Sequence, residues 1–297
     1  MAAVIPTNPA SWLKLNGKVA VVTGAGSGIG RAICQSLAAS GCAVVAADYN
    51  GDSVKETSSL IANTHSKAIC FPCKTDVTDS ADVEKLFKRA EEMSQDLFNA
   101  PPSILVNSAG ITRDGWIGNL TPGEFDDVIN VNLKGSWLTS RQFSLPDRSS
   151  YFKSTPTSGS IINISSIVAV HGNLGQSNYA ASKAGVLGLT RALSKGENEE
   201  RRHAVAFINT FGLTHARCVS TELARSNIRV NAILPGFINT PMSAAVPDKV
   251  KNSMVSRIAM GRFGETEDIA NLAGFLASER SGYMTGCEIE CDGNISM

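Results

Sequence analysis

Tyr179 and Lys183 stand four residues apart in the run YAASK, a spacing that places both side chains on one face of a helix. A free tyrosine has a pKa near ~10, so acid–base work near neutral pH needs a stabilised phenolate. An ammonium group one helical turn away can supply that stabilisation. Ser165 and Ser166 precede the pair, at the end of an apolar run. An isolated Tyr-x-x-x-Lys pair is usually a surface feature, but this combination predicts a proton-transfer site.

A second group of residues, TGAGSGIG over 23–30, follows an apolar run and opens a helical pattern. Glycines in such a turn let a phosphate approach the backbone and the free N–H groups of a helix N-terminus. Arg31 follows where a Walker loop would need Gly-Lys-Ser/Thr. Asp48, at the end of the next apolar run, can accept hydrogen bonds from the adenosine ribose hydroxyls. An acid there repels a 2′-phosphate, and neither Ser27 nor Tyr49 supplies a cation, so the sequence predicts NAD rather than NADP.

These residues need a scaffold of alternating strands and helices. The apolar runs are KVAVVTG, CAVVAAD, KAICFPCKTDV, PSILVNSAG and GSIINISS, and helical patterns separate them. Continuous apolar strands interleaved with helices indicate a parallel sheet covered on both faces. We therefore expect the α/β class, with a single Rossmann-type doubly wound parallel sheet and helices on both faces. Leu145–Gly159 is rich in Ser and Pro and predicts an exposed loop.

Composition excludes several functions. The 297 residues are 43% hydrophobic with a formal net charge of zero, which argues against disorder and against a nucleic-acid partner. No run approaches the ~18 apolar residues of a membrane span, and the first fifteen residues do not resemble a secretory signal. Seven scattered cysteines indicate a reducing compartment. Cys70 and Cys73 lie at an odd spacing in a strand, so we expect them on opposite faces. The four histidines form no ligand set, and no metal site is expected.

From about Leu15 to its C-terminus the chain resembles the short-chain dehydrogenase/reductase family. TGAGSGIG is similar to the family's cofactor loop, NSAG over 107–110 to its central-strand motif, and Tyr179–Lys183 to its active-site pair. Ser166 stands thirteen residues before Tyr179, the family's usual separation, and is therefore preferred to Ser165. Asn132 in VNLKG is similar to the family's fourth catalytic residue.

The resemblance implies roles for these residues. Tyr179 would exchange a proton with the substrate oxygen, and Ser166 would hydrogen-bond that oxygen. Lys183 would hold the nicotinamide ribose and lower the pKa of Tyr179, and Asn132 would position a water. The implied catalytic set is Asn132, Ser166, Tyr179 and Lys183. The implied cofactor-binding set is Thr23, Gly24, Gly26, Ser27, Gly28, Ile29, Gly30, Asp48, Asp76, Val77, Asn107, Ala109, Gly110, Tyr179, Lys183, Pro235, Gly236, Ile238 and Thr240.

Within the family, the runs GSIINISSIV, GQSNYAASKAGV and NAILPGFINTPM are most similar to a branch of hydroxysteroid dehydrogenases and 3-oxoacyl-(acyl-carrier-protein) reductases. That similarity implies an apolar ketone or alcohol as substrate, either an acyl-carrier-protein or CoA thioester or a 17β-hydroxysteroid. It also implies the mitochondrial matrix, with the cytoplasm as alternative, and a homo- or hetero-tetramer. Phe237–Phe263, with Met242, Met254 and Met260, would form a mobile lid over an apolar substrate, although these methionines could equally pack within helices.

One stretch departs from the family pattern. Removing Ala192–Arg217 joins GVLGLTR to CVSTELARSNIRVNAILPG, an uninterrupted match to the family. We therefore expect one domain over 1–297, with an N-terminal extension over 1–14 and an insertion over 192–217. The interrupted helix normally contributes to the family's dimer surface, so the insertion puts the tetramer in doubt. Two functions stay open, an active NAD-dependent dehydrogenase and a non-catalytic dinucleotide-binding subunit of a reductase complex, with epimerase or enoyl-reductase chemistry a weaker third.

Overall fold

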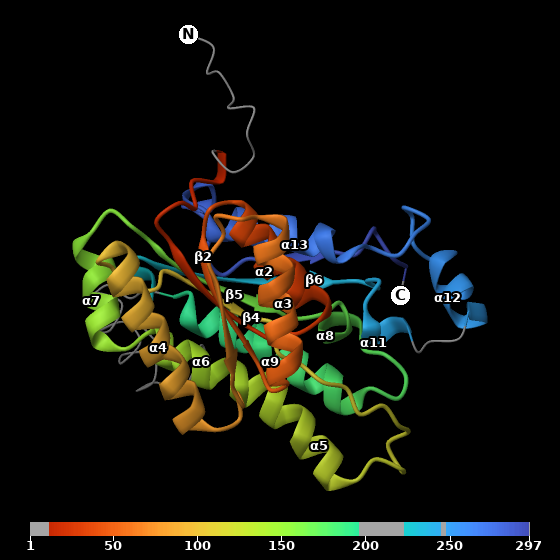
Figure 1. Cartoon of the computed structure of the whole chain (residues 1–297). Coiled ribbons are helices and arrows are strands. Elements are labelled where there is room, and N and C mark those ends of the chain that lie inside the picture. Colours follow the sequence, from red (N-terminus) through yellow and green to blue (C-terminus); the bar gives the residue numbers. More distant parts are fainter. Residues whose placement is uncertain (1–11, 196–222, 245–247, 297) are drawn as a thin grey trace, which may run out of the picture.

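The computed structural model describes residues 12–195, 223–244 and 248–296, in which seven parallel strands form one sheet (Figure 1). The strand order is β3-β2-β1-β4-β5-β6-β7, which confirms the doubly wound arrangement. Because the chain first builds outward from β1 and then returns to place β4 on its other side, a crevice opens between β1 and β4. The strands are β1 (Val19–Thr23), β2 (Ala43–Asp48), β3 (Cys70–Lys74), β4 (Ile104–Asn107), β5 (Gly159–Ile164), β6 (Ile228–Pro235) and β7 (Glu288–Cys291).

Helices cover both faces of this sheet (Figure 1). One face carries α2 (Gly28–Ala39), α3 (Gly51–Thr64) and α13 (Thr266–Ala277). The other carries α4 (Ser80–Phe98), α6 (Gly135–Phe143), α7 (Pro146–Ser154) and α9 (Ser177–Leu193). The remaining described elements are α5 (Pro122–Ile129), the π-helical turn η1 (Asn130–Lys134), α8 (Val168–His171), η2 (Ala224–Ser226), α11 (Pro241–Ala244), α12 (Asp248–Val255) and η3 (Glu279–Ser281).

Successive side chains along a strand pack alternately into two separate cores, one on each face of the sheet. Ala20 and Val22 of β1 pack with α2 and α13, whereas Val19 and Val21 pack on the opposite face with α4 and α6. This arrangement buries the strands on both faces, which explains why they appear in the sequence as continuous apolar runs. Cys70 packs into the first core and Cys73 into the second, so the two thiols lie on opposite faces as predicted.

The described sheet has β3 and β7 as its two edges. Pro72 stands at the centre of β3, opposite Ala46 of β2. The Thr75 amide donates to the Asp48 carbonyl of β2. Because successive residues of a strand direct their backbone N–H groups to opposite sides, the backbone nitrogen of Pro72, three residues earlier, faces away from β2. A proline is tolerated there because its missing N–H faces the open edge.

The expectation of an exposed loop over Leu145–Gly159 is wrong. Pro146–Ser154 forms helix α7, which begins with a proline at its first turn. Phe152 is fully buried and stacks on Phe143 of α6, with 6.1 Å between ring centroids. Arg148, one turn earlier, is also buried, pairs with Glu91 at 2.7 Å and lies over the ring of Phe87. Burial of these two side chains at helical spacing overrides the weak local preference of a serine-rich segment.

The two segments expected to lie outside the family pattern are only partly described. Within the extension expected over 1–14, Trp12 stacks on Phe275 of α13 and Leu13 packs against the same core, so residues 12–14 adjoin the sheet's helical layer. Ala192 and Leu193, the first residues of the expected insertion, belong to α9. Residues 196–222, which include its charged run, lie outside the described residues. None of the described helices has the length and apolar character that a membrane span requires.

Candidate active site

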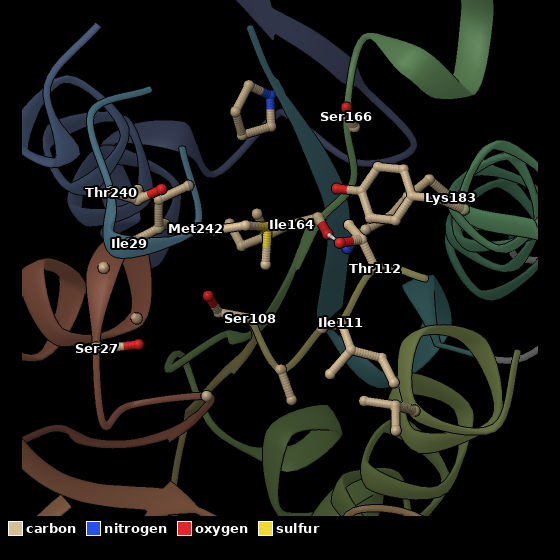
Figure 2. A pocket seen from close by; sticks show the side chains of 18 of the residues that line it. Ser27, Ile29, Ser108, Ile111, Thr112, Ile164, Ser166, Lys183, Thr240 and Met242 are labelled. Carbon is tan, nitrogen blue, oxygen red and sulfur yellow. Dashed lines mark hydrogen bonds between the residues drawn. The ribbon is translucent and has the colours of Figure 1, made fainter. Parts of the chain in front are cut away.

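A cavity of about 860 Å³ opens where the strands end at their carboxyl side. Its wall joins the glycine-rich turn after β1 to the serine, tyrosine and lysine that follow β5. Figure 2 shows Ser27, Ile29 and Thr240 on one side and Ser166 and Lys183 on the other. A cavity of this size and mixed lining suits a ligand larger than a simple metabolite.

The turn between β1 and α2 is shaped for close approach of a ligand to the backbone. Gly24 has a φ of 66°, and a Cβ there would come within 2.7 Å of the Ala109 nitrogen. A Cβ on Gly26 would meet the Asp48 carboxylate at 2.9 Å. Glycine at these positions therefore lets the turn pack closely against the end of β4 and against Asp48. Helix α2 begins at Gly28, so its free N–H groups face the cavity that Ser27, Gly28, Ile29 and Gly30 line.

Asp48 ends β2 and lines the same cavity. Its carboxylate accepts hydrogen bonds from the backbone amides of Gly26 and Asn50, each at 2.9 Å. Arg31 lies close by but pairs with Glu56 at 2.6 Å and donates to the Gly26 carbonyl. Arg31 is not among the residues that line the cavity. The carboxylate is therefore held in place by neutral groups at this end of the site.

Three predicted cofactor residues lie behind the wall instead of in it. The Thr23 hydroxyl accepts hydrogen bonds from the amides of Ser108 and Ala109, each at 3.2 Å, and so ties β1 to the end of β4. Asn107 is buried and its side-chain amide donates to the Asn163 side-chain oxygen of β5 at 2.8 Å. Gly26 also stays outside the lining. These residues fix the backbone that forms the cavity.

The other predicted cofactor residues reach the wall. At the end of β3 Asp76 and Val77 line the cavity, and after β4 Ala109 and Gly110 do the same. Beyond β6 the lining continues through Pro235, Gly236, Ile238 and Thr240. Met242 of α11 lines it too and is 57% exposed, whereas Met254 packs against the core and Met260 lies outside the lining. Only one of the three methionines therefore faces the space that a substrate would occupy.

Tyr179 and Lys183 lie on α9 and reach the cavity from one helical face. Burial raises the pKa of Tyr179 to about 12, and a hydrogen bond with Ser166 opposes that rise. Burial lowers the pKa of Lys183 to about 8. The Lys183 Nζ atom donates to the Ile164 carbonyl at 2.8 Å (Figure 2). The same atom sits 5.7 Å from the centre of the Tyr179 ring.

This geometry differs from the expectation that Lys183 lowers the pKa of Tyr179. The ammonium contacts a strand carbonyl and lies over the ring, and loss of hydration dominates the tyrosine's pKa. The phenol is therefore protonated at neutral pH in this state.

The two candidate serines have different surroundings. The Ser165 hydroxyl donates to the Lys183 carbonyl at 3.0 Å and so serves the packing of α9 on β5. The Ser166 hydroxyl accepts from the Val168 amide, leaving its proton available, and forms the hydrogen bond with Tyr179. The geometry thus favours Ser166 as the serine that faces a reacting group.

Asn132 lies in the π-helical turn η1 and is fully buried. Its side-chain oxygen accepts from the Ile111 amide at 2.9 Å, and its amide group donates to the Ile111 carbonyl and to the Ser182 hydroxyl. Both of its amide hydrogens are therefore used by the protein, and it lies outside the cavity lining. No sequence motif indicated Ser182, which also donates to the Tyr179 carbonyl at 2.8 Å and links Asn132 to the catalytic helix. A wide helical turn of this kind is frequent at functional sites.

Sequence reasoning missed several polar residues of the wall, among them Arg113, Asp114 and Gln176. Arg113 and Asp114 follow the NSAG run directly, and Gln176 precedes Tyr179 by three residues. Charged residues just beyond the carboxyl end of a central strand were the available signal. Among the described residues, no group of three His, Cys, Asp or Glu side chains is arranged to hold a metal ion.

Comparison with known proteins places the chain among dehydrogenases. A family model for short chain dehydrogenases matches residues 18–211, and one described as enoyl-(acyl carrier protein) reductase matches residues 212–295. The chain is 42% identical to the (3R)-3-hydroxyacyl-CoA dehydrogenase of Rattus norvegicus over 290 residues, which cover 97% of this chain and all of the relative.

Solved structures are similar over nearly the whole chain. A dehydrogenase from Agrobacterium tumefaciens with bound NADP superposes with a TM-score of 0.75 at 30% identity, covering 95% of this chain and 97% of the other. The 3-ketoacyl-(acyl-carrier-protein) reductase of Brucella melitensis complexed with NADH gives a TM-score of 0.75 at 26% identity, covering 96% of this chain and all of the other. The cofactors in these two structures differ.

Proposed function

Because the chain belongs to the short-chain dehydrogenase/reductase family, we propose that it interconverts the 3-oxo and 3-hydroxy forms of an acyl thioester, using NAD(H). The observation that carries this proposal is the single cavity that joins the glycine-rich turn and Asp48 to Ser166, Tyr179 and Lys183. A non-catalytic dinucleotide-binding subunit would need only the first half of that wall. The names of the rat and Brucella relatives support an acyl thioester as the substrate class.

The residues of the turn fit a dinucleotide. Gly24, Ser27 and Gly28 line the cavity with little side-chain bulk, and the N-terminus of α2 offers free N–H groups for a pyrophosphate. Asp48 would accept from the adenosine ribose, and Lys183 would hold the ribose next to the nicotinamide. When bound there, the nicotinamide supplies or accepts a hydride.

Residues of the chain itself transfer the proton to the substrate oxygen and stabilise the charge that develops there. Tyr179, protonated at neutral pH, donates its hydroxyl proton to the substrate's carbonyl oxygen during reduction. Ser166 donates a hydrogen bond to the same oxygen and so stabilises the negative charge that develops there. Asn132 forms hydrogen bonds with Ile111 and Ser182. The second lone pair of its side-chain oxygen would be available to accept a hydrogen bond from a water.

The proposed reaction is tested by following NADH oxidation with an acetoacetyl thioester. The wild-type protein should turn over the thioester, and Tyr179→Phe should lose several orders of magnitude in kcat while NADH affinity stays within a few-fold. Ser165→Ala, which alters a packing hydroxyl, is the matched control and should retain most of the activity. Estradiol with NAD is the comparison substrate for the steroid alternative. Substantial turnover by Tyr179→Phe would identify a different proton donor.

The preference for NAD(H) follows from the charge at the adenosine end. A 2′-phosphate there would face the Asp48 carboxylate, and Arg31 is already paired with Glu56. We expect NAD(H) to bind at least about tenfold more tightly than NADP(H), because like charges repel and none of the described residues pairs a cation with Asp48. Titration of both cofactors measures this ratio, and Asp48→Ala should reduce it. Equal affinities in the wild-type protein would refute the preference.

A further inference from the structure

Two loops meet at the end of the cavity that contains Tyr179, and both contribute to its wall. One follows β4 and contains Asp114; the other precedes α9 and contains Gln176. The Gly115 amide donates to the Gly175 carbonyl at 2.8 Å, which joins the loops through their backbones. Gln176 donates from Nε2 to the Asp114 carboxylate at 3.0 Å, and Asn173 in turn donates to the Gln176 side-chain oxygen at 2.9 Å. These bonds fix the place of the Asp114 side chain.

The loop that carries Asp114 is also tied to the catalytic helix. Asn178, fully buried beside Tyr179, donates from its side-chain amide to the Arg113 carbonyl at 2.8 Å. The Tyr179 backbone amide donates to the Asn178 side-chain oxygen at 2.7 Å. The distance between the carboxylate and the tyrosine is thus set by a chain of hydrogen bonds.

Within residues 12–195, 223–244 and 248–296, the charge of Asp114 has no counter-ion. Arg113 lies next to it in sequence but pairs with Asp127 at 3.8 Å and donates to the Thr112 carbonyl. Lys183, the other cation of this wall, donates to the Ile164 carbonyl. Among the described residues Asp114 forms no ion pair, and its hydrogen-bond partner is a neutral amide. The remaining charged residues of the wall, Asp48 and Asp76, lie at the adenosine end and are also negative.

Asp114 and Tyr179 line the same cavity, and the Asp114 charge adds to the rise in the pKa of the Tyr179 phenol that burial causes. A substrate carbonyl must approach the same hydroxyl. In a free 3-oxo acid the carboxylate is separated from that carbonyl by one methylene carbon, so its negative charge enters the same region. In a thioester or an ester the corresponding group is neutral.

We propose that Asp114, held by Gln176 at the substrate end of the cavity, excludes free 3-oxo acids and so restricts the protein to 3-oxoacyl groups in uncharged linkage. This inference rests on the proposed function and narrows its substrate class. It assigns a specificity-determining role to a residue outside the proton-transfer set. The physical cause is repulsion between two carboxylates, which solvent weakens because the Asp114 side chain is exposed.

The test compares two ketones that differ in one charge, acetoacetate and ethyl acetoacetate. Their affinities for the protein saturated with NADH are measured by calorimetry, and kcat/KM is measured in parallel. We expect Asp114→Asn to raise the affinity for acetoacetate about fivefold and to change that for the ester less than about twofold. High salt should reduce the wild-type discrimination, because it screens exposed charges.

Two variants serve as matched controls. Asp126→Asn removes the same charge from an exposed position on α5 outside the cavity wall and should leave both affinities unchanged. Asp114→Glu keeps the charge and should keep the discrimination. An unchanged ratio in Asp114→Asn, or equal gains for both ketones, would overturn the inference, as would failure of either ketone to bind to any of the proteins. Failure of the proposed function appears separately, as absence of turnover of the acetoacetyl thioester by the wild-type protein.

Discussion

At the scale of single residues, Lys183 shows the cost of placing a charge inside the fold. Its side chain is almost wholly buried, and the hydrogen bond from its Nζ atom to the Ile164 carbonyl is the only one described for that atom. Burial lowers its pKa from 10.5 to about 8, which corresponds to a cost of about 3 kcal/mol in the charged form. A charged group that destabilises the folded state and lines a cavity indicates a functional role.

Replacing this lysine should therefore stabilise the protein and abolish its activity. Because the folded pKa lies below the unfolded value, the penalty is full below pH 8 and fades as pH rises toward 10.5. We expect Lys183→Met to raise Tm by a few degrees at pH 7 and by much less near pH 10.5. Thermal melts at both values measure this, with exposed Lys67→Met as the control. A lower Tm at pH 7 would mean that its hydrogen bond outweighs the cost of burial.

At the scale of elements, local signals predicted the strands β1 to β5 and the helices between them, but not β6, β7, α7 or η1. β1, β4 and β5 are buried on both faces, so their sequences are continuous apolar runs that need no tertiary information. In α7 the sequence PDRSSYFKS has little helical character. This helix depends on tertiary contacts, because Phe152 packs against α6 and Arg148 forms an ion pair with α4. The π-helical turn likewise depends on the contacts of Asn132 with Ile111 and Ser182.

The same distinction applies to the site. Tyr179, Lys183 and the glycine-rich turn form patterns that are local in sequence, so they could be recognised before the structure. Asp114 and Gln176 lie 62 positions apart, and only the pairing of their loops brings them together. Thr23 and Asn107 were placed at the cofactor because of their motifs, whereas their hydrogen bonds show that they hold other residues in position.

The role of α7 in the core can be measured directly. Phe152→Ala should lower the free energy of unfolding by about 3–5 kcal/mol, because it leaves a cavity between Phe143 and Tyr151. Chemical denaturation measures the change, and NADH affinity of the folded protein should stay unaltered. Phe71→Ala, at a position 49% exposed on β3, should change the free energy of unfolding by less than about 1 kcal/mol. Similar small losses for both variants would argue against a packed α7.

At the scale of the whole molecule, β3 is one of the two edges of the described sheet at which another chain could add a strand. The outward-facing backbone positions of β3 include Cys70, Pro72 and Lys74, and the middle one carries no N–H group. A strand added here would meet a gap in its hydrogen-bond ladder, and Lys74 places a positive charge beside it.

Restoring the missing donor should promote aggregation without unfolding the protein. We expect Pro72→Val to aggregate faster than the wild type at a temperature below Tm, as followed by light scattering. Pro72→Lys supplies the same N–H with a charged side chain and should aggregate no faster than the wild type. Equal rates for all three proteins would show that this edge does not control association.

Pro72 has a further consequence during synthesis of the chain. β1, β2 and β3 leave the ribosome before β4. The growing polypeptide therefore carries three strands of the sheet while β1, which becomes a central strand, still lacks β4 on its other side. The β1 side of that half-sheet is closed when β4 arrives, but the β3 side receives no further strand among the described residues. Pro72 therefore protects the nascent chain at the one boundary that later synthesis leaves open.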